Sequence, residues 1–165
     1  MDGPAIRWAG PSDHDALGMV MFDAVHTDDS LYTAAQRAAW MPTPRAGPDW
    51  SARLGAQRVV LAEDGAGRAL GFMGLEPPDH LDFAYIRPEA RGRGLFRRLF
   101  AMIEAEARAL GACELRTEAS LLARGPMETV GFVVQREETV SMGAERLRRF
   151  VMRKPLSLHA APPSR

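Results

Sequence analysis

The 165-residue chain is short of cysteine and of long hydrophobic runs. Cys113 is its only cysteine, so no intrachain disulfide can form and a reducing compartment is the default. No stretch approaches the roughly 18 to 20 apolar residues that a bilayer-spanning helix needs. The first residues, Met1 to Pro4, contain neither a basic region nor an apolar run, so we expect no secretory signal. These absences predict a cytoplasmic protein that does not associate with membranes.

A surplus of charge of one sign is also missing. The 21 Lys and Arg residues balance 21 Asp and Glu residues, which gives a formal net charge of zero. This balance argues against general polyanion binding, so we expect no nucleic-acid partner, although a local basic patch stays open. The composition, 46% hydrophobic and 25% charged, is typical of a globular domain, and the length suits one domain.

Several sequence motifs of common enzyme classes are absent. No Lys-Ser or Lys-Thr pair follows a glycine-rich loop, as a Walker motif requires. A Rossmann fingerprint would need a third glycine where the chain has Arg97. The four histidines show no metal-ligand spacing and no Gly-x-Ser-x-Gly elbow is present, so we expect neither a metal site nor a serine hydrolase.

Hydrophobic periodicity predicts a mixed α+β chain in which short strands and helices alternate. We assign residues 1–154 to a single domain, and we expect residues 155–165, with three prolines and two serines, to form a flexible tail. The proline-rich stretch 42–50 is expected to be a loop. The predicted strands are 6–9, 58–63, 69–75, 81–87, 113–117, 132–140 and 146–152, and the predicted helices are 13–25, 33–40, 95–110 and 121–130.

The strongest local signal is a strand that runs through a glycine-containing turn into an amphipathic helix. Gly92 and Gly94 allow backbone N–H groups to approach a ligand, and a helix start presents unpaired N–H groups, so the turn predicts a phosphate site. Cations are normally unfavourable at a helix N-terminus, and a bound anion would reverse that cost for four arginines, Arg91, Arg93, Arg97 and Arg98. The alternative is a solvated basic face beside Glu104 and Glu106.

This turn resembles the acetyl-CoA loop of the GNAT acyltransferases, Arg/Gln-x-x-Gly-x-Gly/Ala. Arg91 and Gly94 match its first and fourth positions, whereas Phe96 replaces the small residue at the sixth. We expect the Phe96 ring to turn into the core. Residues 120–132 are similar to a second family pattern, Asn-x-x-Ala-x-x-Phe-Tyr-x-x-x-Gly-Phe. The chain matches this pattern at Ala123, Gly131 and Phe132. It departs from the pattern at Ser120, Pro126 and Met127, which replace Asn, Phe and Tyr.

The resemblance implies a fold with a central, mostly antiparallel sheet of six to seven strands flanked by about four helices. It also implies an N-acetyltransferase that uses acetyl-CoA as the acyl donor. A primary amine of a small molecule or peptide would attack the thioester directly, and a homodimer is left open. The acetyl-CoA-binding residues that it implies are Tyr85, Ile86, Arg87, Arg91, Gly92, Arg93, Gly94, Leu95, Phe96, Arg97 and Ser120.

The usual proton donor of the family is a tyrosine, and Met127 occupies its position. Tyr85, Ser120 or a water molecule are the candidates for this role, although Ser120 is equally suited to cap the following helix. Asp82 is the first candidate for the base and Glu118 the second. Strand alternation predicts that only one of Asp82 and Tyr85 faces the acceptor.

The missing tyrosine leaves a second class of function open. A catalytically silent domain that binds acyl-CoA as a sensor or assembly partner would not need a proton donor. Release of a free thiol from acetyl-CoA in the presence of an amine discriminates between the two classes.

Overall fold

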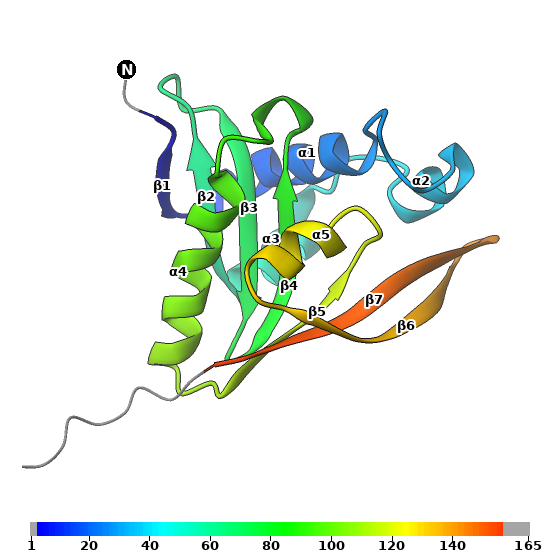
Figure 1. The fold of residues 1–165 in the computed structure, drawn as a ribbon. Helices are drawn as coiled ribbons and strands as arrows, with labels where there is room; N and C mark the ends of the chain where they lie inside the picture. Colours follow the sequence, from blue (N-terminus) through cyan, green and yellow to red (C-terminus); the bar gives the residue numbers. More distant parts are fainter. Residues whose placement is uncertain (1–2, 157–165) are drawn as a thin grey trace, which may run out of the picture.

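The computed structural model describes residues 3–156, which form one seven-stranded sheet with helices on both faces (Figure 1). The strand order is β1-β2-β3-β4-β5-β7-β6, and every neighbouring pair is antiparallel except β4 and β5. The predicted mixed α/β fold with a mostly antiparallel sheet is therefore confirmed. The strands are β1 (Ala5–Trp8), β2 (Arg58–Glu63), β3 (Ala69–Glu76), β4 (His80–Ile86), β5 (Glu114–Ala119), β6 (Val133–Met142) and β7 (Glu145–Pro155).

Five helices accompany the sheet in the described residues, one more than the sequence predicted. The additional helix, α3, lies partly in the stretch 42–50 that was expected to be a loop. Its proline, Pro48, lies in the first helical turn, where a missing N–H costs no hydrogen bond. Within residues 3–156, none of the helices is long and apolar enough to span a membrane. The helices are α1 (His14–Val25), α2 (Ala34–Trp40), α3 (Gly47–Gly55), α4 (Leu95–Ala109) and α5 (Arg124–Thr129).

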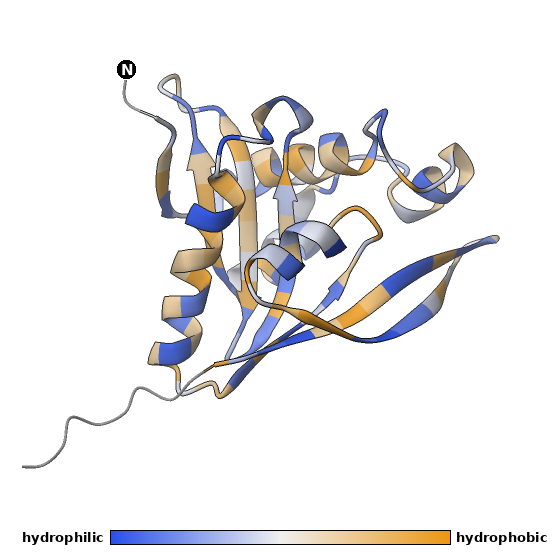
Figure 2. Cartoon of the chain, viewed as in Figure 1, coloured by the Kyte–Doolittle hydropathy of each residue, from blue (hydrophilic) through white to orange (hydrophobic). Residues whose placement is uncertain are grey.

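The sheet separates two hydrophobic clusters. Because successive side chains of a strand point to opposite faces, Val60 packs in the cluster that contains α4. Its neighbours Val59 and Leu61 pack in the cluster that contains α1 and α3. Both faces of the central strands are thus covered, and these strands are largely apolar, whereas much of the β6–β7 hairpin is hydrophilic (Figure 2).

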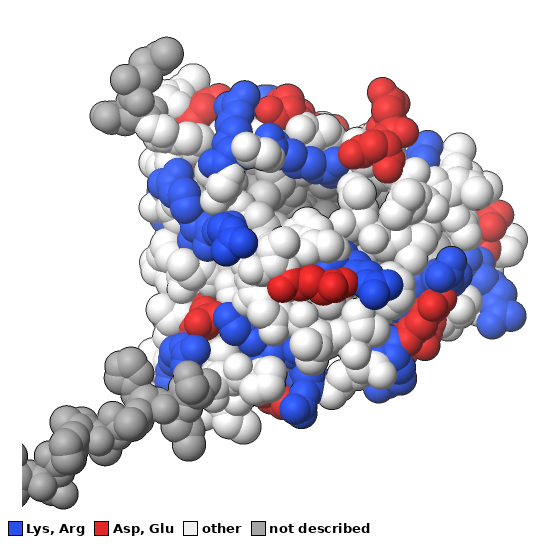
Figure 3. Space-filling model, viewed as in Figure 1, with Lys and Arg blue, Asp and Glu red and all other residues white. Residues whose placement is uncertain are grey.

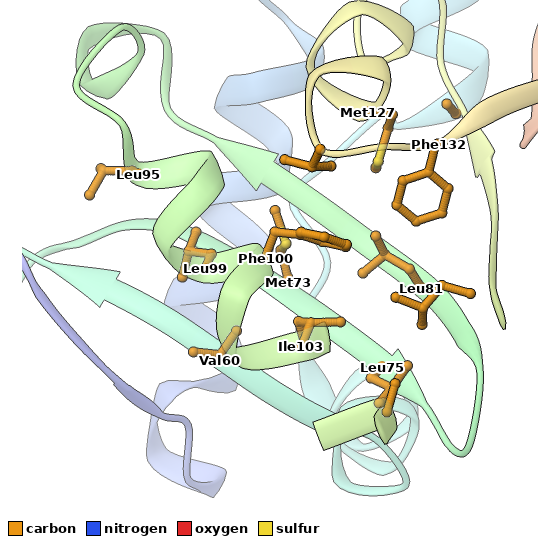
Figure 4. Close-up of a cluster of buried hydrophobic side chains, with 14 of the residues drawn as sticks. Val60, Met73, Leu75, Leu81, Leu95, Leu99, Phe100, Ile103, Met127 and Phe132 are labelled. Carbon is orange, nitrogen blue, oxygen red and sulfur yellow. The ribbon is translucent and has the colours of Figure 1, made fainter. Parts of the chain in front are cut away.

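Helix α4 fixes the position of the glycine-containing turn. Its apolar stripe, Leu95, Leu99 and Ile103, is at most 1% exposed and packs on the sheet beside Met73 (Figure 4). Burial of each such side chain contributes about 1.5–3 kcal/mol. The first turn of the helix is therefore held firmly against the end of β4.

Strands β4 and β5 pair only over a short length. The register contains His80 with Arg116 and Leu81 with Thr117, and beyond these residues the two strands diverge (Figure 1). The divergence opens the middle of the sheet toward the C-terminal ends of both strands, which is where ligands bind in open α/β sheets.

The end of the fold differs from the prediction. Pro155 ends β7, and Leu156 is 5% exposed and donates its N–H to the Cys113 carbonyl at 2.9 Å. Residues 155 and 156 therefore belong to the fold rather than to the expected tail, and residues 157–165 lie outside the described residues. Cys113 itself is exposed.

Candidate functional site

A cleft of about 590 Å³ lies where β4 and β5 diverge. Its walls come from the end of α1 and the following loop, the end of β4, the start of α4 and the segment before α5. The space-filling view shows a hollow in this face with basic side chains near its rim (Figure 3). The cleft thus brings together the turn before α4 and the segment around Ser120, which the sequence placed far apart.

The turn before α4 has the backbone conformation that its glycines permit. Gly92 and Gly94 have φ values of 75° and 77°, in the left-handed region, and an added Cβ would meet no atom within 4 Å at either position. The first helical hydrogen bond runs from the Arg98 N–H to the Gly94 carbonyl at 3.2 Å. The N–H groups of residues 95–97 lie before this first hydrogen bond and have no acceptor within the helix, so they are available to an anion.

The arginines of this turn have different roles. Arg91 donates to the Asp29 carboxylate at 3.2 Å and to the Ala24 carbonyl at 3.3 Å, and so ties the turn to the end of α1. Arg97 lines the cleft and has no ion-pair partner in the described part of the chain. Arg93 does not line the cleft. Arg97 is therefore the side chain best placed to add charge to the anion site.

The orientation of Phe96 was predicted incorrectly. Its side chain is partly buried against the α4 cluster and also lines the cleft, rather than turning wholly into the core. Phe96 follows Leu95 by one position, about 100° around the helix, which places it at the edge of the buried stripe. The ring thus contributes an apolar wall to the cleft.

The edge of β4 that faces β5 lacks a strand partner beyond Leu81. The Arg87 N–H bonds to the Leu70 carbonyl of β3 at 2.8 Å, and alternation turns the N–H and C=O of Ile86 toward the open edge. The Arg87 side chain is buried, binds the Ala69 carbonyl and pairs with Asp23, and it does not line the cleft. Ile86 is therefore placed to pair with a ligand, whereas Arg87 holds β4 to its neighbours.

A second, smaller cavity of about 230 Å³ adjoins the cleft. The two share a common wall, which we call the junction. A molecule in the cleft and a molecule in the cavity would meet at the junction. Its residues are Tyr32, Trp40, Ala84, Tyr85, Ser120 and Ala123.

A β-bulge in β4 overturns the expectation that Asp82 and Tyr85 face opposite ways. Leu75 of β3 pairs with Leu81 and Gly74 pairs with Phe83, so Asp82 is an extra residue without a partner in β3. The bulge resets the alternation, and Asp82 and Tyr85 both line the smaller cavity.

Two hydroxyl groups lie at the junction among the predicted site residues. Tyr85 packs against Phe72 and Trp40, and its hydroxyl has no hydrogen-bond partner among the described residues. Burial raises the pKa of Tyr85, so its hydroxyl stays protonated. The Ser120 Oγ accepts the Ala123 N–H at 3.2 Å, which is the capping interaction, and leaves the hydroxyl hydrogen free to donate.

The two predicted bases are both engaged by partners. The Asp82 carboxylate accepts hydrogen bonds from Arg53 at 3.0 Å and from Gln57 at 2.7 Å. The Glu118 carboxylate lies 2.6 Å from the His80 Nε2; this hydrogen bond lowers the pKa of Glu118 and raises that of His80. Both carboxylates line the smaller cavity as members of ion pairs.

Met127 lies where the second motif placed it. Its side chain is 2% exposed, belongs to the α4 cluster and forms part of the wall of the smaller cavity (Figure 4). The thioether has no proton to donate, so the hydroxyl groups nearest the junction are those of Tyr85, Ser120 and Tyr32.

Sequence reasoning missed Tyr32 and Arg45. The Tyr32 hydroxyl donates to the Arg148 carbonyl at 2.5 Å and accepts the Leu121 N–H at 3.1 Å, which joins the α1–α2 loop to β7 and to the segment before α5. Arg45 lies in the proline-rich stretch and lines the smaller cavity. Neither residue stands in a motif. The sequence contains no local signal that points to either residue.

Comparison with known proteins agrees with this geometry. Residues 30–154 match the family model of the acetyltransferase (GNAT) domain. The chain belongs to the GNAT acetyltransferase family. The predictions of this family and of an acetyltransferase are thus confirmed. A search of curated proteins found no match.

Solved structures show the same fold. A GCN5-related N-acetyltransferase from Rhodopseudomonas palustris is 31% identical, with a TM-score of 0.85 over 94% of this chain and 98% of that one. A phosphinothricin acetyltransferase from Sinorhizobium meliloti in complex with AcCoA is 18% identical, with a TM-score of 0.72 over 98% of this chain and 93% of that one. The PaiA N-acetyltransferase from Thermoplasma acidophilum in complex with coenzyme A is 17% identical, with a TM-score of 0.68 over 94% of this chain and 100% of that one.

No group of three or more His, Cys, Asp or Glu side chains within residues 3–156 is arranged to hold a metal ion.

Proposed function

We propose that the protein transfers the acetyl group of acetyl-CoA to the primary amine of a small molecule or peptide. The observation that carries this proposal is the junction, where a cleft suited to the donor meets a smaller cavity suited to an amine. Similar folds with acetyl-CoA and coenzyme A bound support the choice of donor.

The residues of the cleft fit acetyl-CoA. The N–H groups of residues 95–97 and the Arg97 side chain would hold the pyrophosphate, and Gly92 and Gly94 leave room for it. The free edge at Ile86 would pair with the amide-containing arm of the donor, as an added strand pairs with a sheet edge. Together these contacts would direct the thioester toward the junction.

The junction supplies polar groups for the transfer. An amine in the smaller cavity would attack the thioester carbon, and the C–S bond would break to release a thiolate. The Tyr85 hydroxyl would donate a hydrogen bond to the charge that develops on oxygen or sulfur, and Ser120 is placed for a second one. Asp82, held by Arg53, would act as a polar wall for the amine and accept its proton through water.

This arrangement favours an enzyme over a silent sensor. The replacement of tyrosine by Met127 removes one proton donor, but Tyr85 brings a protonated hydroxyl to the junction. A CoA thiol, with a pKa near that of free cysteine at about 8.5, also leaves without a dedicated acid.

The Gly94→Asp variant tests the placement of the donor. The new carboxylate would lie where the pyrophosphate is proposed, so we expect loss of the thermal stabilisation that CoA gives to the wild type. Gly67→Asp is the matched control, because Gly67 has a φ of 81° and equally open surroundings in the β2–β3 turn. Equal stabilisation of both variants by CoA would show that CoA does not bind at the turn before α4.

A panel of primary amines tests the reaction itself. Wild-type protein should release thiol from acetyl-CoA and yield the N-acetylated amine by mass spectrometry with at least one of them. Stabilisation by CoA with no acetylated product from any amine would instead support the acyl-CoA sensor.

A further inference from the structure

The smaller cavity combines an apolar wall with a few charged groups. Its apolar side chains come from α5, β6, β7 and β4 and include Met127, Val140, Met142 and Leu147. Its volume of about 230 Å³ lies below the roughly 300–1,000 Å³ of pockets for drug-sized ligands. The cavity thus suits a small acceptor with an apolar portion.

The charged groups of this cavity do not balance. Three arginines, Arg45, Arg53 and Arg149, line it together with two acids, Asp82 and Glu118. Arg53 pairs with Asp82 at 3.0 Å, and Arg149 bonds to Glu138 at 2.7 Å. Arg45 remains, and within residues 3–156 its guanidinium has no hydrogen-bond or ion-pair partner.

Arg45 is fixed in this position by its own backbone. Its carbonyl oxygen would lie 1.8 Å from a Cβ at Gly18, so the loop packs directly on α1 at a glycine. The Arg45 Nε is buried without a partner, which is costly unless another group completes the hydrogen bond. Arg45 and Tyr85 both line this cavity, so a small ligand in it would have both side chains in its wall. A carboxylate in the cavity would complete this hydrogen bond and neutralise the charge.

We propose that the acceptor is a free amino acid with an apolar side chain, whose carboxylate binds Arg45 while its amino group faces the junction. This inference rests on the proposed function, which requires an amine. An α-amino acid places a carboxylate beside the amine, which suits a small cavity that has Arg45 and Tyr85 in the same wall. Its side chain would occupy the wall formed by Met127, Met142 and Leu147. The amino terminus of a peptide has no carboxylate at that position.

The experiment compares L-leucine with L-leucinamide and 3-methylbutylamine, and repeats the first pair for valine, methionine and phenylalanine. Each amine is assayed with acetyl-CoA for kcat/KM in the wild type, in Arg45→Gln and in the control Arg58→Gln. Arg58 lies on β2, and its ion pair with Glu106 is outside both cavities. Because all three proteins face the same amines, the ratio between variants cancels differences in amine basicity.

We expect Arg45→Gln to lower kcat/KM for the preferred amino acid by about 10- to 100-fold, which is the effect of one lost hydrogen bond between charged groups. The value for the matching amide should change by less than about threefold, since the amide carries no charge for Arg45 to bind. Arg58→Gln should match the wild type, and CoA should stabilise all three proteins equally.

Two results would overturn this inference and leave the proposed function intact. One is that amides or simple amines are acetylated by the wild type while none of the four amino acids is. The other is that Arg45→Gln lowers kcat/KM equally for acids and amides. Absence of acetyl transfer to every amine would instead contradict the proposed function itself.

Discussion

At the scale of single residues, the sequence identified candidate side chains for the junction but did not predict toward which face of the sheet they point. Tyr85 and Asp82 stand out in the sequence as candidates on one strand. The bulge at Asp82 arises from the pairing with β3, and a register shift between strands leaves no local signal in the chain. The sequence therefore singled out both residues as candidates, but their relative orientation was predicted incorrectly.

Tyr85 gives the first residue-scale prediction. Tyr85→Phe should lower kcat by about 10²-fold or more, the effect of losing one positioned donor. Burial raises the pKa of Tyr85, so in the wild type the rate should rise with pH as the acceptor amine deprotonates and should not fall again below pH 10. The pH–rate profiles of both proteins check this; identical profiles would assign the donor role to solvent.

The His80–Glu118 pair gives a prediction for stability. The raised pKa of His80 means that its contribution is full below the ordinary value of about 6.5 and is lost as the pH rises through the folded pKa. The lowered pKa of Glu118 means that its contribution is full above the ordinary value of about 4.3 and is lost in more acidic solution. The ionic part of the pair is therefore strongest between these two values.

Glu118→Gln should accordingly reduce stability by about 1 kcal/mol near pH 5.5, after allowance for solvent screening of partly exposed groups. In a protein of this size that corresponds to a Tm lower by about 2–4 °C. The difference from the wild type should shrink as the pH rises past the pKa of His80. A constant difference from pH 5 to pH 9, measured by thermal unfolding, would show that the pair does not titrate.

At the scale of elements, helix α4 and the turn before it were predictable and the surrounding loops were not. The 3.6-residue stripe of α4 and the glycines at 92 and 94 are local signals, and both hold in the structure. Helix α3 was missed because prolines normally mark loops, although Pro48 is harmless in a first helical turn. Arg45 could not be identified, since its role depends on a cavity built by other elements.

Phe96, at the border of the α4 stripe, gives the element-scale prediction. The ring is partly buried and partly in the cleft, so Phe96→Ala should cost about 1–3 kcal/mol of stability and also weaken CoA binding. Phe100→Ala is the comparison, because Phe100 is 3% exposed and packs on Phe132. It should cost about 3–5 kcal/mol and leave the CoA affinity of the folded protein unchanged.

Thermal unfolding and calorimetric titration with CoA measure both effects. A Phe96→Ala protein that loses as much stability as Phe100→Ala yet binds CoA normally would place the ring in the core, as the sequence first suggested.

At the scale of the whole molecule, the site is a consequence of topology. The parallel neighbours β4 and β5 pair over two registered residue pairs and then diverge, and α1, α4 and α5 surround the opening. No single segment contains this gap, so the sequence analysis did not predict it. The α1–α2 loop is joined to β7 through Tyr32, which lines both the cleft and the smaller cavity.

The most direct test of the account is a crystal structure of the protein with CoA bound. The account predicts the pyrophosphate on the N–H groups of residues 95–97, the pantetheine arm along the free edge of β4 at Ile86, and the sulfur at the junction within hydrogen-bonding distance of the Tyr85 hydroxyl. CoA bound elsewhere, or a sulfur directed away from the smaller cavity, would contradict it.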